Sequence, residues 1–241
     1  MTTHELSCRR HGEGTPLVLL HPLALSAQLW TPLVQRLVED HAVFAFDLRG
    51  HGRSDWDGNP FTISDLADDV VAALDRLGLE SVRLAGMSMG GSVAMTLAGR
   101  HPDRVRSLLL ADTTAWYGPD APTAWAERAA KATGVPREQQ LPFQLDRWFS
   151  EAFRAEHSEE VQRVARIFLA TASPAHAAAS VAMGALDARE LLPAITAPTL
   201  VLVGEHDYAT PPAMATVLAD TIPNATLRVL PTVRHLSLIE H

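Results

Sequence analysis

The sequence predicts an α/β protein with a mostly parallel, doubly wound sheet and a group of helices inserted between two of its strands. Five short apolar runs, each followed within two residues by a polar residue or glycine, are typical of buried strands in a sheet covered on both faces. These runs are residues 16–20, 42–46, 82–85, 105–110 and 199–203. Strands that alternate with helical segments favour right-handed crossovers within one sheet.

Helix signals separate the strand-like runs. Ser64 stands where an N-cap is expected, immediately before Asp65, and apolar residues follow at helical spacing. These residues are Leu66, Val70, Ala73 and Leu74. A run of small residues at 90–95 predicts another helix, directly after the third apolar run.

The alternation of strands and helices stops between residues 116 and 189. This stretch has no strand-like run, and its prolines are expected to divide it into short helices; they are Pro119, Pro122, Pro136, Pro142 and Pro174. Such an insertion would stand over the carboxyl ends of the strands, where open α/β sheets bind ligands. We therefore expect one core, formed by residues 1–115 and 190–241, with a helical cap of residues 116–189.

Composition narrows the class of protein. With 241 residues, 47% hydrophobic and 20% charged, the chain can fill a large core without disulfides or metals. The net charge of −8 argues against sequence-independent nucleic-acid binding, which requires clustered Lys and Arg. The one cysteine, Cys8, cannot form an internal disulfide. A polar N-terminus and the lack of an 18-residue apolar run predict a soluble, cytoplasmic protein without a membrane segment.

The pattern G-x-S-x-G at residues 86–90 is the strongest chemical signal. It follows a predicted strand and opens a helix of small residues, which is the context of a serine nucleophile on a tight strand-to-helix turn. Glycines two residues to either side would relieve crowding of the backbone around Ser88. The alternative is a glycine-rich turn with an incidental serine.

A serine nucleophile needs a histidine base that a carboxylate orients. In this arrangement the chain order is serine, acid, histidine. After Ser88, the sequence has Asp207 just past a strand end and His235 near the C-terminus, which matches that order. Asp207 could instead cap the helix that is expected near residue 212, with Asp112 or Glu205 as the acid. His235 has the alternative of a purely structural role.

An oxyanion hole requires two backbone N–H donors aimed at one point. The amide of Met89 is one candidate. The loop after the first apolar run supplies the second, and Leu23 is preferred because Pro22 has no N–H. For His21 a loop-bracing role is preferred over catalysis, although it is also a candidate to line the substrate pocket.

The polar, glycine-rich segment 47–55 lacks the spacing and lysine of a Walker phosphate loop. Its charged side chains are expected to bond the loop backbone and one another.

These motifs together resemble the α/β-hydrolase superfamily along essentially the whole chain. They are residues 21–23, 47–54, 86–91 and 204–207, with His235. A narrower resemblance, to 3-oxoadipate enol-lactonases of bacterial aromatic catabolism, rests on residues 110–113, 146–150, 153–154, 168–171, 207–212 and 235–237. The chain departs from these relatives in having His21-Pro22 where most have His-Gly. It also ends six residues after His235, where relatives continue into a last helix.

The resemblance implies hydrolysis of a small lactone or ester through an acyl-enzyme, without cofactor or metal. Because an enol-lactone substrate is anionic and the protein carries −8, a local positive group is expected, with Arg147 and Arg154 as candidates. Trp148, Phe149 and Phe153 are expected either to line the pocket or to pack between helices.

Other functions remain open at this point. A general carboxylesterase, with or without cofactor-free perhydrolase activity, and a non-catalytic ligand receptor are the alternatives. A dehalogenase is disfavoured because it would carry Asp in place of Ser88. The expected partners are a small-molecule substrate and water, with neither nucleic acid nor membrane, and the oligomeric state stays open.

Overall fold

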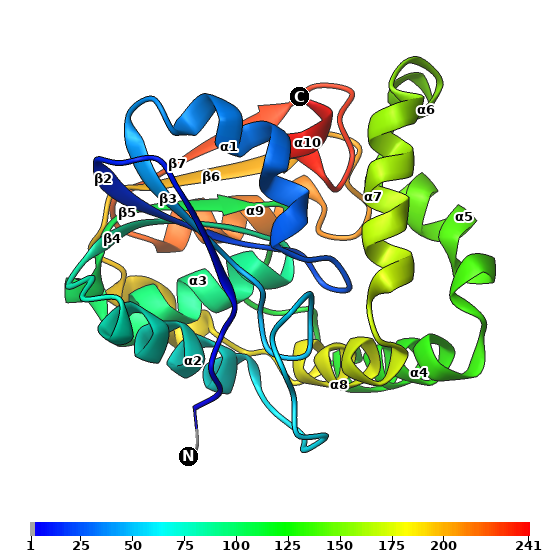
Figure 1. Cartoon of the computed structure of the whole chain (residues 1–241), viewed down its shortest axis with the longest axis horizontal. Coiled ribbons are helices and arrows are strands. Elements are labelled where there is room, and N and C mark those ends of the chain that lie inside the picture. The colour runs from blue at the N-terminus through cyan, green and yellow to red at the C-terminus, as the bar shows by residue number, and fades with distance from the viewer. Residues whose placement is uncertain (1–2) are drawn as a thin grey trace.

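Seven strands form one sheet in the computed structural model, which describes residues 3–241 (Figure 1). Their order across the sheet is β1-β3-β2-β4-β5-β6-β7, and only the edge strand β1 runs antiparallel to its neighbour. The strands are β1 Cys8–His11, β2 Thr15–Leu20, β3 His41–Phe46, β4 Val82–Met87, β5 Val105–Ala111, β6 Thr199–Gly204 and β7 Ala225–Leu230. Met1 and Thr2, at the start of the expected first part of the core, lie outside the described residues.

All five apolar runs are strands, so the prediction of a mostly parallel sheet is confirmed. The sequence did not reveal β1 and β7, which are the two edge strands. Both expose part of their residues, and β7 alternates between half-buried and exposed positions. Edge strands of this kind lack the continuous apolar pattern that marks a central strand.

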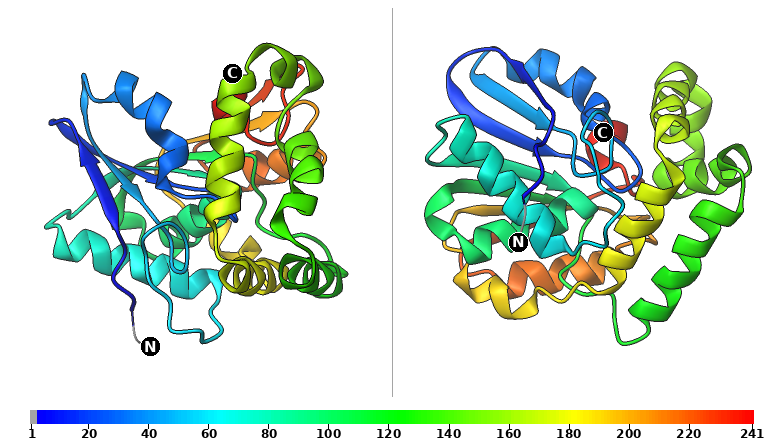
Figure 2. Two further views of the ribbon diagram at one scale, coloured as in Figure 1. Left: turned by 45° about the vertical axis from the view of Figure 1, so that its right-hand side comes forward. Right: turned by 60° about the horizontal axis from the view of Figure 1, so that its bottom comes forward.

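Helices cover both faces of the sheet (Figures 1 and 2). One face carries α2 Ile63–Arg76, α3 Met89–Arg100 and α9 Pro212–Thr221; the other carries α1 Thr31–Leu37 and the short α10 Ser237–Glu240. On this second face an apolar hollow lies between α1 and α10. Its lining includes Leu17, Leu33, Leu109, Leu200 and Leu238.

The predicted N-cap of α2 is wrong, because Ser64 lies inside the helix and Thr62 caps it. The Thr62 hydroxyl accepts the Asp65 N–H at 3.1 Å, and the Asp65 carboxylate accepts the Thr62 N–H at 2.7 Å. This reciprocal pair needs an acidic residue or glutamine three positions after the cap. Thr62 meets that condition, whereas the residue three positions after Ser64 is Ala67.

Five α-helices occupy the chain between β5 and β6, and we call them the cap helices. They are α4 Ala121–Gly134, α5 Arg137–Trp148, α6 Glu151–Glu156, α7 Ser158–Ala170 and α8 Ser173–Gly184. Figures 1 and 2 show them standing together beside the sheet. An isolated bridge pairs Trp116 with Asp187, so the chain leaves and rejoins the sheet layer at one point.

Prolines mark the ends of the cap helices, with one exception. Pro122 and Pro174 lie in first turns, and Pro136 is the N-cap of α5. Pro142, however, lies inside α5, so the expected break there is wrong. A proline removes one helical hydrogen bond, yet α5 continues past it to Trp148, and Gln144 and Trp148 are buried in this second half.

No single helix within residues 3–241 is long and apolar enough to cross a membrane. The helices α7 and α8 would be long and apolar enough only if they were joined, and the chain bends by 94° between them.

Candidate active site

Ser88 sits on the sharp turn between β4 and α3. Its backbone has φ 53° and ψ −120°, an unusual conformation for a residue with a side chain, and only 6% of it is exposed. A Cβ at Gly86 would lie 2.2 Å from the Gly90 carbonyl oxygen, and a Cβ at Gly90 would lie 2.2 Å from the Leu20 carbonyl oxygen. The two glycines therefore let the turn press against its own helix and against the end of β2.

His235 links Ser88 to Asp207. Its Nε2 lies 2.9 Å from Ser88 Oγ, and its Nδ1 lies 2.7 Å from Asp207 Oδ2. The Thr210 hydroxyl donates to Asp207 Oδ2 at 2.7 Å, and the Ala209 N–H donates to Oδ1 at 2.7 Å. The structure thus brings the three predicted residues into one hydrogen-bonded chain of carboxylate, imidazole and hydroxyl.

The electrostatics of Asp207 favour its charged form. Burial alone would raise the pKa of Asp207, but the charge of His235 and the hydrogen bonds from His235 and Thr210 together hold the pKa below its ordinary value. An ionised carboxylate at this place fixes the proton of the imidazole on Nδ1 and leaves Nε2 free to accept the Ser88 proton.

The other two candidate acids do not contact His235. Asp112 is fully buried, and its carboxylate accepts the Gly204 N–H at 3.1 Å and the Ser237 hydroxyl at 2.6 Å. Burial, with the charge of Asp207 added, raises the pKa of Asp112 well above its ordinary value. Glu205 is exposed and accepts the Thr232 N–H at 3.0 Å. Only Asp207 among the three stands behind the imidazole.

The N–H groups of Leu23 and Met89 are the oxyanion donors expected from the sequence, and both are unengaged in the part of the chain that the structure describes. Neither group donates a hydrogen bond within residues 3–241. Met89 is the first residue of α3, and the N–H groups of a helix's first turn have no partner within the helix. The next amide in the loop is engaged, because the Ala24 N–H donates to His51 Nε2 at 3.2 Å. The Leu23 N–H is therefore free to donate to a ligand, whereas the Ala24 N–H is not.

Two neutral histidines brace the loop that carries Leu23. His21 donates from Nδ1 to the Pro22 carbonyl at 2.7 Å and accepts the Leu48 N–H on Nε2 at 2.9 Å. His51 lies beside it and bonds Arg49 O and Ala24 N–H in the same manner. Burial lowers the pKa of His21 to about 4 and that of His51 to about 3. His21 therefore has no ring nitrogen left for a substrate, which fits the bracing role.

The segment 47–55 also serves the loops, as expected from its composition. Asp47 accepts the Ala27 N–H at 2.7 Å and the Arg53 N–H at 3.1 Å, and the Ser54 hydroxyl donates to the Asp47 carbonyl at 2.5 Å. Arg49 makes two hydrogen bonds of 2.8 Å with the buried carboxylate of Asp69.

The aromatic residues at the end of α5 and the start of α6 pack between helices. Trp148 is buried edge-on against Phe168, and Phe149 is fully buried and stacks on Phe153. The Trp148 carbonyl accepts the Leu236 N–H at 3.1 Å, which ties the end of α5 to the residue after His235.

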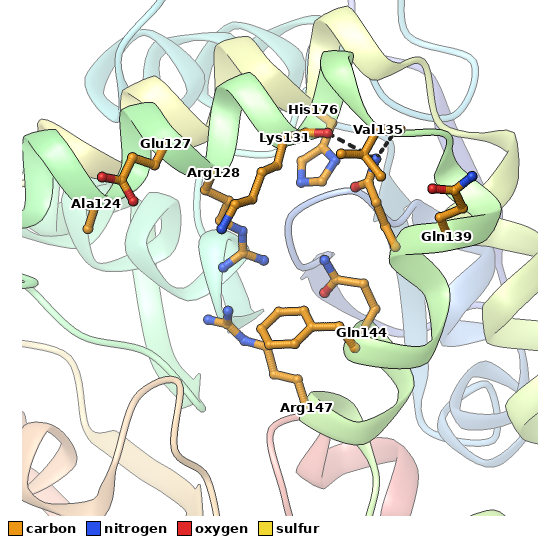
Figure 3. A pocket seen from close by; sticks show the side chains of 11 residues that line it. Ala124, Glu127, Arg128, Lys131, Val135, Gln139, Gln144, Arg147 and His176 are labelled. Atoms are coloured by element: carbon orange, nitrogen blue, oxygen red, sulfur yellow. Dashed lines mark hydrogen bonds between the residues drawn. The ribbon is translucent and has the colours of Figure 1, made fainter.

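The two cationic candidates of the cap behave differently. Arg154 pairs with Asp146 at 3.0 Å. Arg147 instead lines a cavity of about 350 Å³ between α4, α5 and α8, which we call the cap cavity (Figure 3). Its polar lining also includes Arg128, Lys131, Gln144 and His176.

Comparison with known proteins decides the family. The family described as "alpha/beta hydrolase fold" matches residues 15–241, which is nearly the whole chain. The chain belongs to the alpha/beta hydrolase fold family. The fold class predicted from the five strands and the G-x-S-x-G turn is thereby confirmed.

Individual relatives of this α/β hydrolase carry several names. The RutD protein of Azorhizobium caulinodans, named as a candidate carbamate hydrolase, is 33% identical over 224 residues, which cover 90% of this chain and 83% of that protein. The 3-oxoadipate enol-lactonase 2 of Acinetobacter baylyi is 30% identical over 228 residues, or 93% and 83% of the two chains. The enol-lactonase structure from Burkholderia xenovorans LB400 superimposes with a TM-score of 0.91 at 32% identity, covering 96% of this chain and 90% of that one. The resemblance to enol-lactonases is confirmed.

Sequence reasoning on this α/β hydrolase missed several residues around the site. Thr210, three residues after Asp207, could have been found as the partner of a turn-forming aspartate. Ser237 and Arg128 gave no such signal, because a lone serine or arginine on a helix is usually a surface residue.

Proposed function

We propose that this α/β hydrolase cleaves a small lactone or ester through an acyl-enzyme on Ser88, and that its substrate is 3-oxoadipate enol-lactone, an intermediate of aromatic catabolism. The observation that carries the proposal is the 2.9 Å contact between His235 Nε2 and Ser88 Oγ, with Asp207 behind the imidazole at 2.7 Å. Residues 116–189 act in this proposal as a cap over the site.

The first half of the reaction forms the acyl-enzyme. Ser88 Oγ attacks the lactone carbonyl while His235 Nε2 takes its proton, and the N–H groups of Leu23 and Met89 stabilise the oxyanion. When the tetrahedral intermediate collapses, the ring C–O bond breaks and His235 returns the proton to the leaving enol. The enol becomes a ketone, which makes ring opening effectively one-way.

The second half releases the product. Water attacks the acyl carbon as His235 takes a proton from it, the bond to Ser88 Oγ breaks, and the proton passes to Ser88. Asp207 holds the imidazole in the required tautomer throughout.

Turnover of 3-oxoadipate enol-lactone beside p-nitrophenyl acetate and a small aryl carbamate tests this proposal. We expect the largest kcat/KM for the lactone and its loss in Ser88→Ala. Negligible lactone turnover, with hydrolysis of p-nitrophenyl acetate, would assign the chain to general carboxylesterases. Failure of every substrate in a folded sample, together with failure of a fluorophosphonate to label Ser88, would favour a ligand receptor.

A further inference from the structure

Two arginines of the cap cavity have no acidic partner. Arg128 on α4 and Arg147 on α5 form no ion pair within the described residues, and the Nε atom of each is buried without a hydrogen-bond acceptor. Figure 3 shows their guanidinium groups facing each other across a gap. Both residues are half-buried, and two like charges that are partly shielded from water repel each other more strongly than in bulk solvent, so an anion between them would be stabilising.

Both arginines are electrostatically strained by this placement. Burial, with the charge of Arg147 added, lowers the pKa of Arg128 well below its ordinary range. Burial likewise lowers the pKa of Arg147. The acidic residue on the cavity rim, Glu127, is exposed, and its side chain points away from the gap between the guanidinium groups (Figure 3).

His176 contributes an unused N–H donor to the same cavity. Arg137 can only donate, so its 3.3 Å contact with His176 Nδ1 makes Nδ1 the acceptor and places the imidazole proton on Nε2. Burial first, then the charges of Arg128 and Arg137, lower the pKa of His176 to about 2, so the ring is neutral. Nε2 is buried and has no partner, in a residue that is 1% exposed.

Gln144 adds a second unpartnered polar group. The residue is 5% exposed, and its Oε1 makes no hydrogen bond. Its amide points into the cavity beside the two guanidinium groups (Figure 3). Either the carbonyl or the NH₂ end of an amide can face a ligand. Gln144 can therefore add an N–H donor to those of Arg128 and Arg147 around an anion in the cavity.

The elements that line the cap cavity contact both loops of the proposed catalytic site, since the carbonyl of Trp148, next to Arg147, accepts the N–H of Leu236, next to His235, at 3.1 Å. Arg128 and Arg147 also line a second hollow that reaches Tyr208 and Ala209, and the Ala209 N–H bonds Asp207. On the opposite side, the hydroxyl of Thr171, just before α8, donates to the Ala24 carbonyl of the loop that carries Leu23 at 2.9 Å, and α8 carries His176. The cap helices α5 and α8 thus hold Arg147 and His176 on the elements that pack against the proposed site.

We propose that Arg128 and Arg147, with His176 Nε2–H and the Gln144 amide, bind a carboxylate that the substrate carries away from its scissile carbonyl. This inference rests on the proposed function and assigns the residues that select its substrates, so that anionic esters and lactones are preferred to neutral ones. Guanidinium groups suit a carboxylate because their N–H donors match its two oxygens.

The test compares two esters that differ in one charge. Mono-p-nitrophenyl glutarate carries a free carboxylate, and p-nitrophenyl glutaramate replaces it with a neutral amide of similar size. We expect wild-type kcat/KM to favour the charged ester by about 100-fold, because hydrogen bonds from guanidinium groups to a carboxylate are stronger than those to a neutral amide. In Arg128→Gln and Arg147→Gln we expect this ratio to fall at least tenfold, and Arg→Lys at either position to restore part of it.

The ratio is the readout because a folding defect lowers both rates equally. Arg166→Gln is the matched control, since it removes the same charge from an exposed position of α7 and should keep the wild-type ratio. A wild-type ratio near one, or a ratio retained in both Gln variants, would overturn the carboxylate site and leave the proposed hydrolysis standing.

A different result would show failure of the proposed function instead. If the wild type hydrolyses neither ester, calorimetric titration with glutarate decides the carboxylate site by itself. Binding that is lost in Arg147→Gln and kept in Arg166→Gln supports the site, and the absence of binding to the wild type overturns it.

Discussion

The carboxylate of Asp112 accepts both the hydroxyl and the N–H of Ser237, at 2.6 and 3.0 Å. The same carboxylate accepts the Gly204 N–H. Gly204 ends β6, just before the loop that carries Asp207, and Ser237 follows His235 by two residues. Asp112 therefore connects the two loops of the proposed triad without contacting the imidazole. One buried acid thus positions the segments that hold the proposed catalytic acid and base.

This division of roles predicts different effects of two isosteric substitutions. Asp207→Asn should lower kcat for ester hydrolysis by roughly 10⁴-fold, because it removes the charge that orients the imidazole. Asp112→Asn should reduce kcat far less and lower the free energy of unfolding by about 1–3 kcal/mol, since one buried donor loses its acceptor. Steady-state kinetics and urea denaturation of both variants measure this, and a larger kcat loss in Asp112→Asn would reverse the assignment.

The turn at Ser88 predicts a steric penalty at Gly90. A Cβ there would lie 2.2 Å from the backbone oxygen of Leu20, so Gly90→Ala should destabilise the protein by at least about 2–3 kcal/mol. Gly134 is the control, because a Cβ there meets nothing within 4 Å at the end of α4. Gly134→Ala should be neutral or slightly stabilising. Equal unfolding midpoints for the two variants in urea would show that the turn tolerates a side chain.

The buried neutral histidines predict that stability falls as the solution is acidified. Burial lowers the pKa of His21 to about 4, of His51 to about 3 and of His176 to about 2, against 6.5 as the ordinary value. Below pH 6.5 the unfolded chain gains protons at these rings that the folded chain does not, so stability present above pH 6.5 is lost toward lower pH. Each ring should contribute a loss of about 2 kcal/mol between pH 6.5 and pH 5.

Urea unfolding at a series of pH values checks this linkage. His51→Gln should flatten the pH dependence, whatever its effect on absolute stability, while His11→Gln, at an exposed position of β1, should leave the slope unchanged. An unfolding free energy that stays constant from pH 7 to pH 5 would show that these histidines are protonated in the folded state.

The sequence identified the parts of the fold that local pattern controls. The central strands are continuous apolar runs, and the G-x-S-x-G turn has a fixed local geometry, so both could be predicted. The edge strands β1 and β7 could not, because each faces solvent and lacks that pattern. At α2, both Ser64 and Thr62 are good cap residues, and only the spacing to Asp65 selects Thr62.

The cap cavity shows what sequence alone could not reveal. Arg147 was a candidate because of the net charge of −8, but nothing marked Arg128 as its neighbour. The two residues lie on separate helices, and their approach depends on how α4 and α5 are arranged around α8. The choice among Asp207, Asp112 and Glu205 likewise needed the hydrogen bonds, since all three lie just past the carboxyl ends of parallel strands.

The central claim is that Ser88 is the nucleophile, and intact-protein mass spectrometry after treatment with a fluorophosphonate tests it most directly. We predict one adduct per chain, located on the peptide that contains Ser88, with loss of ester hydrolysis in proportion to labelling. Ser88→Ala should take up no label and retain no hydrolysis above that of Asp207→Asn. Hydrolysis at the wild-type rate in Ser88→Ala, or an adduct on a different residue, would contradict the account.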